Sequence, residues 1–218
     1  MAAVKALALR AEVELRIPAR VDQLCCGTPW SSKGFVDGYA VVQRRTRRLL
    51  EAATEHGKLP VVIDATSCTE GLSRLLDNAG PEIAVVDAVT FVADHILPRL
   101  TVHTVLPSIA LHPTCSSRRL QLDDVVRSVA AQIADETYVP TDWQCCAFAG
   151  DRGMLHPELT ASATRDEARS ISAQDCSAHA SVNRTCEIGM TRATGRAYVH
   201  LIELVERATR PLPTSDRG

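Results

Sequence analysis

The sequence has few aromatic residues, no surplus of basic charge and no apolar run long enough to cross a bilayer. Aromatic side chains make up 4% of the 218 residues, and the formal net charge is −2 at pH 7. Nucleic-acid-binding domains generally carry a basic surplus, and those that bind single strands use aromatic stacking platforms, so we expect no nucleic-acid partner. The most apolar stretch, residues 83–97, contains Asp87, Asp94 and His95. It is shorter than the ~20 residues of a transmembrane helix, so we expect no transmembrane segment.

Three further absences narrow the range of possible locations and functions of the protein. The N-terminus shows no secretory signal pattern, so we expect a cytoplasmic protein that is either free or peripheral at the inner face of the plasma membrane. No G-x-G-x-x-G motif follows a predicted strand, which predicts no flavin or nicotinamide site and gives no catalytic residue to assign. No C-x-x-C motif marks a thiol–disulfide enzyme.

The sequence does contain eight cysteines, and six of them form a repeated pattern. Two adjacent pairs, Cys25-Cys26 and Cys145-Cys146, are each followed by a single cysteine, Cys68 or Cys186. The single cysteine comes 42 residues after the first pair and 40 residues after the second. The two halves are therefore offset by 120 residues at the pairs and by 118 at the single cysteines, which indicates an internal duplication. Cytoplasmic cysteines in such patterns are typically metal ligands or redox thiols rather than disulfides.

One further cysteine belongs to the second half alone. Cys115 lies 30 residues before Cys145, and its counterpart in the first half would carry the number −5. The first site is therefore predicted to lack its opening ligand, either because the chain is a fragment or because this site is degenerate. Cys176 falls outside the pattern and is interpreted as incidental.

Four cysteines of the second half match the number of thiolates that usually hold one iron–sulfur cluster: Cys115, Cys145, Cys146 and Cys186. Adjacent side chains leave neighbouring Cα atoms in divergent directions, which suits two irons of a cluster better than one zinc ion. The sequence therefore favours an iron–sulfur site over a zinc site. The remaining interpretation is that all eight cysteines are small buried hydrophobic side chains.

Helical periods alternate with short apolar runs, which favours an α/β fold of two duplicated modules with short, mostly parallel sheets. We place the modules at residues 1–100 and 101–208 and expect a disordered tail at 209–218. Strands are expected at 13–17, 60–65, 83–88, 136–140 and 180–186, and in a run that ends close to Cys115. Helices are expected at 2–11, 37–57, 69–80, 120–136, 156–171 and 198–208.

Five segments carry a family resemblance: CCGTPWSSKG at 25–34, DATSCTEG at 64–71, LHPTCSSRRL at 111–120, CCAFAGDRGMLHPELTASAT at 145–164 and NRTCEIGM at 183–190. They resemble the cysteine-rich CCG domains of heterodisulfide reductase and of the glycolate oxidase iron–sulfur subunit, over about residues 2–208. The likeness is greatest to the C-terminal region of bacterial FAD- and iron–sulfur-containing D-lactate dehydrogenase-like oxidoreductases.

The resemblance implies a duplicated Rossmann-like α/β module. It also implies that this module transfers electrons through an iron–sulfur cluster of 4Fe-4S type. The cofactor-binding residues would be Cys115, Cys145, Cys146 and Cys186 at the second site, with Cys25, Cys26 and Cys68 at the first. FAD would be held on a missing domain or on a partner protein that oxidises a 2-hydroxy acid such as D-lactate or glycolate. Electrons would leave for a quinone or a cytochrome, and the chain is not expected to be active alone.

The sequence departs from the family pattern at three points. Ala147 replaces the glycine of the second CCG motif, where glycine would serve a positive φ or a close approach to a cluster. Ala65 and Asn183 replace the first cysteine of a terminal C-x-x-C, and the opening cysteine of the first half is missing. Two other functions stay open: a non-catalytic zinc-binding or metal-free interaction module left by truncation, and a thiol–disulfide enzyme with a vicinal disulfide.

Charged residues near the cysteines have simpler interpretations. Lys33 either neutralises an anion or lies solvated in its loop. Arg118 and Arg119 could bind a carboxylate bidentately, but we expect both at the surface. Residues 151–152 are interpreted as a structural pair at a turn. His112 and His156 could contact a cluster, but we interpret both as hydrogen-bonded structural histidines.

Overall fold

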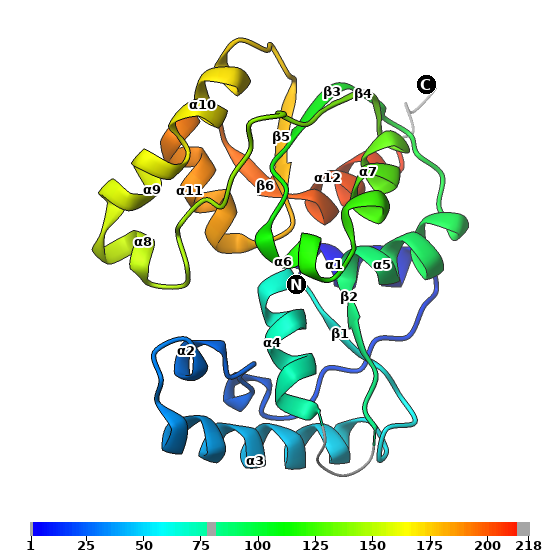
Figure 1. The fold of residues 1–218 in the computed structure, drawn as a ribbon. Coiled ribbons are helices and arrows are strands. Elements are labelled where there is room, and N and C mark those ends of the chain that lie inside the picture. The colour runs from blue at the N-terminus through cyan, green and yellow to red at the C-terminus, as the bar shows by residue number, and fades with distance from the viewer. Residues whose placement is uncertain (1, 78–81, 213–218) are drawn as a thin grey trace.

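The computed structural model describes residues 2–77 and 82–212, which form two lobes (Figure 1). The first lobe contains the two-stranded parallel sheet β1–β2, and the second lobe contains a four-stranded parallel sheet in the order β4-β3-β5-β6. The strands are β1 (Val61–Ile63), β2 (Val85–Asp87), β3 (Leu106–Leu111), β4 (Ala134–Tyr138), β5 (Ala178–Ser181) and β6 (Tyr198–His200). The predicted α/β fold with short parallel sheets is confirmed.

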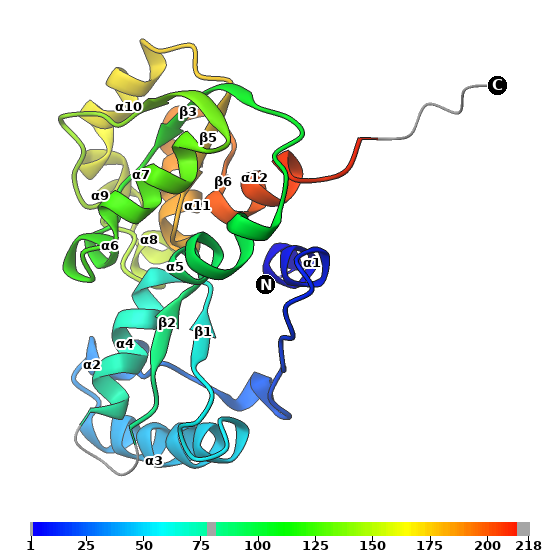
Figure 2. The same cartoon turned by 90° about the vertical axis from the view of Figure 1, so that its right-hand side faces the viewer.

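Helices cover both faces of the larger sheet, with α9, α10 and α11 on one side and α7 and α12 on the other (Figures 1 and 2). The helices are α1 (Ala2–Arg10), α2 (Thr28–Ser31), α3 (Val36–Ala53), α4 (Thr66–Leu76), α5 (Ala88–Phe91), α6 (Cys115–Arg119), α7 (Asp123–Ala131), α8 (Arg152–Leu155), α9 (Pro157–Ala163), α10 (Arg165–Ser172), α11 (Arg184–Thr194) and α12 (Leu201–Ala208). Helix α5 continues through a π turn and a 3-10 turn as far as Arg99.

The two halves of the chain repeat the same order of elements. Helices α1 and α7 each have 9 residues, and α4 and α11 each have 11. Strand β2 runs directly into α5 as β6 runs into α12. In both places the last strand residue caps the helix, since Asp87 accepts from the Val89 amide and His200 from the Ile202 amide. Strands β1 and β2 therefore correspond to β5 and β6.

The prediction of a strand at 13–17 is wrong, because this segment has no strand beside it. Its counterpart in the second half is β4, which pairs with β3. Among the described residues of the first half, no strand corresponds to β3, and residues 13–17 stay extended without a ladder. A strand needs a neighbour for its backbone hydrogen bonds, and sequence pattern cannot replace that neighbour.

Several predicted boundaries also move. Residues 198–200, expected in the closing helix, form β6, because Tyr198 and His200 pair in register with His179 and Ser181 of β5. The helix expected at 120–136 ends at Ala131 because the following residues join the sheet as β4. The helix expected at 156–171 is divided into α9 and α10 at Thr164.

The largest apolar core joins the two halves of the chain. It contains Leu7 of α1 and Val89 of α5, both from the first half, together with Ile109 of β3 and Ile202 of α12, all fully or almost fully buried. Helix α1 lies against α12 of the second lobe (Figure 2). The proposed division at residues 100 and 101 stays a prediction.

Most of the tail expected at 209–218 lies outside the described residues, while Thr209 is buried and bonded to Arg10. Within the described parts of the chain, no helix combines the length and apolar character that crossing a membrane requires.

Candidate metal centre

Three segments of the second lobe bring four cysteines to the carboxyl end of its sheet. Thr114 caps α6, and its side chain accepts the Ser117 amide, so that Cys115 is fixed as the first helical residue. The loop after β4 carries Cys145 and Cys146. Cys186 lies in the first turn of α11, not in the turn before it as the sequence suggested. The carboxyl end of parallel strands is where open α/β sheets place their sites.

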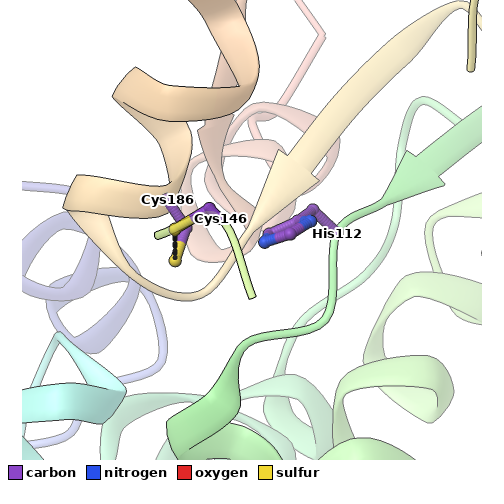
Figure 3. A group of neighbouring side chains, drawn as sticks. All are labelled: His112, Cys146 and Cys186. Carbon is purple, nitrogen blue, oxygen red and sulfur yellow. Dashed lines mark hydrogen bonds between the residues drawn. The ribbon is translucent and has the colours of Figure 1, made fainter. Parts of the chain in front are cut away.

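Cys146 and Cys186 form the most buried part of this site. Their sulfurs are 3.1 Å apart, and both residues are buried (Figure 3). A nitrogen of His112 and these two sulfurs all lie within 4.8 Å of one another. The His112 ring turns one edge toward the two cysteines in Figure 3. Among the described residues, this is the one group of three or more potential ligands that meets so closely.

Cys115 and Cys145 form a second, more exposed pair at the same site. A hydrogen bond with Cys115 lowers the pKa of Cys145 to about 6 despite partial burial, and it raises the pKa of Cys115. In the same way, a shared hydrogen bond lowers the pKa of Cys146 to about 5 and raises that of Cys186. Each pair thus shares one proton and offers one thiolate near neutral pH. Binding of a metal must displace the remaining proton of each pair.

His112 is held by a buried carboxylate. Its Nδ1 atom is 2.7 Å from Oε1 of Glu167, and both side chains are 1% exposed. Burial by itself would lower the pKa of His112, but the Cys146 thiolate and the Glu167 carboxylate raise it to about 9. Nε2 of His112 is buried and has no hydrogen-bond partner among the described residues. The interpretation of His112 as a hydrogen-bonded structural histidine is therefore right but incomplete, because the ring also faces the thiols.

The loop that carries the second pair has a strained backbone. Ala147 has a φ of 53° and Ala149 a φ of 42°, both in the left-handed region that side chains disfavour. The equivalent of Ala147 in the first lobe is Gly27, with a φ of 79°. A Cβ atom at Gly27 would lie 2.6 Å from the Tyr39 ring, so only glycine fits there. The expectation that this position needs a positive φ is confirmed.

The first lobe holds three cysteines in a similar arrangement. Thr46 fixes the backbone of Cys25, because its hydroxyl donates to the Cys25 carbonyl at 3.1 Å and accepts from the Cys25 amide at 3.4 Å. A hydrogen bond with Cys68 lowers the pKa of Cys26 to about 5, while it raises the pKa of Cys68. The described residues add neither a fourth thiol nor a histidine to this group.

A glycine three residues after each single cysteine lets the cysteine pair approach the helix. A Cβ atom at Gly71 would lie 3.1 Å from the Cys26 carbonyl oxygen and 2.2 Å from the Thr28 hydroxyl. At Gly189 a Cβ atom would lie 3.2 Å from the Thr160 methyl group and in ordinary contact, at 3.7 Å, with the Cys146 Cβ atom. Both sites share the C-x-x-G spacing, which the cysteine spacing did not reveal, and the tighter approach is at Gly71.

Hydrogen bonds connect the two sites directly. The Thr66 and Thr114 hydroxyls, just before Cys68 and Cys115, are 3.1 Å apart and buried. Ser67 donates to the Asn183 Oδ1 atom at 2.9 Å, and the Asn183 Nδ2 atom lies 3.7 Å from the Cys186 sulfur. Asn183 stands where the family's C-x-x-C would place a cysteine, and here it bridges the sites.

Outside the two sites, the other singled-out residues have ordinary surroundings. Arg119 makes two hydrogen bonds to Glu70 of α4, at 2.7 and 2.9 Å, and so links the lobes at the surface. Lys33 pairs with Asp151 at 2.7 Å, which corrects the expected pair of residues 151 and 152. Cys176 lies apart from both sites, as expected.

The donor set of the second site fits a thiolate-bound metal group. Four sulfurs and one unpartnered buried nitrogen can hold an iron–sulfur cluster, with Cys115, Cys145, Cys146 and Cys186 as the thiolates. The smaller set of His112, Cys146 and Cys186 also matches the nitrogen and sulfur ligands of zinc.

The family model of the CCG cysteine-rich domain matches the chain twice, at residues 1–73 and 109–191. These matches cover more than half of the chain. The chain belongs to the CCG cysteine-rich domain family. Both matches of this CCG chain end shortly after the glycine of the C-x-x-G pattern, Gly71 or Gly189. The second match begins in β3, whereas the first begins at α1, so the segment with Cys115 is matched once. A comparison with curated proteins found no match.

The sequence located every cysteine that the structure brings together. It did not identify His112 as part of the centre. The signal that could have found it is the run HPTC, since a histidine three residues before a ligand cysteine shares its turn.

Proposed function

We propose that this CCG chain is an iron–sulfur electron-transfer module, with its principal cluster at Cys115, Cys145, Cys146 and Cys186. The observation that carries the proposal is the convergence of the two buried thiols of Cys146 and Cys186 with a nitrogen of His112, beside the Cys115–Cys145 pair at the same end of the sheet. When bound, a cluster would supply a one-electron redox centre. The chain's own residues would hold it, keep water from its buried side and place His112 against it.

Glu167 defines the role of His112 in this proposal. A carboxylate bonded to one ring nitrogen fixes the ring and directs the other nitrogen toward the thiols. A protonated His112 would offset part of the negative charge that thiolates bring into a buried site. His112 and Glu167 are thus positioning residues that lower the cost of burying the thiolates.

The wider setting follows from the resemblance. We propose that an FAD-linked dehydrogenase domain or subunit, oxidising a 2-hydroxy acid such as D-lactate or glycolate, supplies the electrons. A quinone or a cytochrome would receive them. The hydrogen bonds that join the two cysteine groups support electron passage between them once both are loaded.

Anaerobic reconstitution with iron and sulfide tests the cluster. The wild-type chain is expected to gain iron, labile sulfide and a broad visible absorption band, and the Cys145→Ser/Cys146→Ser variant to lose most of each. Cys176→Ser is the matched control and should behave as wild type, because Cys176 lies outside both sites. A wild-type chain that stays colourless and free of iron would overturn the proposal.

The proposed source of the electrons needs a separate test. The reconstituted chain is mixed anaerobically with a flavoprotein D-lactate dehydrogenase and D-lactate, and the visible band is followed. Bleaching that requires both the flavoprotein and D-lactate supports the proposed setting. If dithionite bleaches the band but the flavoprotein with D-lactate does not, the proposed electron donor is wrong, although the cluster itself is present.

A zinc-stabilised interaction module is the second candidate, because His112, Cys146 and Cys186 alone form a compact ligand set. It predicts a chain that is purified with one zinc ion and takes up no sulfide on reconstitution. Zinc removal would then lower the melting temperature, and His112→Ala would release the ion.

A further inference from the structure

A cavity of about 580 Å³ opens beside the two-stranded sheet of the first lobe. Its walls are mostly apolar and include Val13, Leu15 and Ile17 on one side and Val61 and Ile63 of β1 on the other. The three cysteines of the first site, Cys25, Cys26 and Cys68, also line the cavity. Figure 2 shows the chain after α1 running down beside β1 without joining the sheet.

In the second lobe the equivalent space is occupied by β3. There β3 pairs with β4 on one side and with β5 on the other, parallel to both. The two halves can be aligned by placing α1 on α7 and α4 on α11. In this alignment residues 13–17 correspond to β4, and residues 60–63 correspond to β5. The cavity therefore lies where the counterpart of β3 would lie, between the two segments that would flank it.

Both walls of the cavity present an unused backbone edge. Within the described residues, β1 has a strand partner only in β2. Residues 14–17 make no backbone–backbone hydrogen bond to any described residue. Two open edges on either side of an apolar space are complementary to an extended peptide, which would pair with both.

We infer that this cavity binds a partner β-strand from outside residues 1–218. The strand would run parallel to β1, carry apolar side chains and end in a turn with a cysteine, as β3 ends before Cys115. Parallel insertion would bring that cysteine to the carboxyl end of β1, where Cys68 lies in the first turn of α4 and where Cys25 and Cys26 line the same cavity. The partner would thus complete both the sheet and the first set of four thiols.

A second copy of this chain does not fit as the donor. Its matching segment, β3, is the buried interior strand of its own sheet, where Ile109 and Ala110 are 0% exposed. To donate β3, the second lobe would have to unfold. The inserted strand must therefore come from a different segment.

A synthetic peptide tests the insertion. The peptide VLPSIALHPTCSSR, which copies residues 105–118, carries a fluorescent label and is titrated into the 218-residue chain under reducing conditions. Fluorescence anisotropy is expected to show saturable binding. Hydrogen exchange is expected to slow at residues 14–17 and 61–63, the two walls of the cavity.

Two matched variants identify the binding surface. Ile17→Arg changes a cavity residue that is 47% exposed, so it should fold and weaken binding at least tenfold. Leu9→Arg changes an exposed leucine of α1, 82% exposed and outside the cavity, and should bind as wild type. A peptide N-methylated at the positions of Ile109 and Leu111 should not bind, because it lacks the amides that would pair with one wall of the cavity.

The role of the peptide's cysteine is measured separately with cobalt(II) in the Cys145→Ser/Cys146→Ser background. The cysteine peptide should increase the thiolate-to-cobalt absorption, and a peptide with serine at that position should bind equally well without the increase. Absence of peptide binding, protection at β4 or β6 instead of the cavity walls, or equal binding by Ile17→Arg would overturn the inference. Peptide binding does not depend on iron, so its outcome is separate from that of the reconstitution.

Discussion

The chemistry of this CCG chain begins with pairs of thiols that share a proton. In each site the second cysteine of the adjacent pair, Cys26 or Cys146, is hydrogen-bonded to the single cysteine. This hydrogen bond lowers the pKa of Cys26 and of Cys146 to about 5. Adjacent cysteines point in different directions, so each finds a different partner, and this divergence makes the CC motif suited to a group larger than one ion. The first cysteine of the second pair meets Cys115, and the corresponding partner of Cys25 would come from the inserted strand.

Ala147 provides a prediction at the scale of one residue. Its left-handed φ of 53° disfavours a side chain, and the same position in the first lobe is Gly27. Ala147→Gly is expected to raise the free energy of unfolding by about 1 kcal/mol, since the relief of strain exceeds the added flexibility of the unfolded chain. Urea denaturation measures the change.

The control for Ala147→Gly is Ala161→Gly in the exposed part of α9, which should destabilise the protein by up to about 1 kcal/mol. If both substitutions destabilise equally, the strain at Ala147 does not contribute to stability.

At the scale of elements, the two junctions in which a strand runs directly into a helix are each capped by the residue that ends the strand. Asp87 does this at β2 and α5, and His200 does it at β6 and α12. Because a cap acceptor must be unprotonated at the accepting atom, the histidine makes its junction sensitive to acid. Burial, followed by the charge of Arg184, lowers the pKa of His200 to about 4.

The depressed pKa of His200 predicts a loss of stability in acid. The unfolded chain binds a proton near pH 6.5, whereas the folded chain does not until about pH 4, so stability falls as the pH falls through this window. Between pH 7 and pH 5 the wild type should lose about 2 kcal/mol more than His200→Asn, which keeps an acceptor for the cap. Urea denaturation at both pH values measures the difference. Equal losses of stability in the two proteins would show that protonation of His200 does not destabilise this junction.

At the scale of the whole molecule, the first helix belongs to the core of the second lobe. Arg10 at the end of α1 donates to Thr209 at 2.7 Å and pairs with Glu206 of α12 at 3.0 Å. Both partners of the ion pair are largely buried, with side chains 22% and 10% exposed. The N-terminal helix α1 therefore holds the C-terminal helix α12 in place.

This contact gives the prediction for the whole molecule. Arg10→Ala is expected to lower the free energy of unfolding by about 1–3 kcal/mol, because it leaves Glu206 with one buried partner fewer. Arg210→Ala is the matched control on the same carboxylate; the Arg210 side chain is 62% exposed, so its removal should cost clearly less than that of Arg10. Urea denaturation should show the ordering, and a larger effect for Arg210 would contradict the assigned role of α1.

The sequence by itself determined the α/β class, the duplication and the seven cysteines of the two sites, because these depend on periodicity and spacing along the chain. Only the tertiary structure placed His112 and Glu167 at the thiols, turned residues 198–200 into a strand and left residues 13–17 without one. Those outcomes depend on neighbours that are distant in sequence. A strand forms where another strand offers its hydrogen bonds, and a histidine becomes part of a centre when the fold turns its free nitrogen toward the sulfurs.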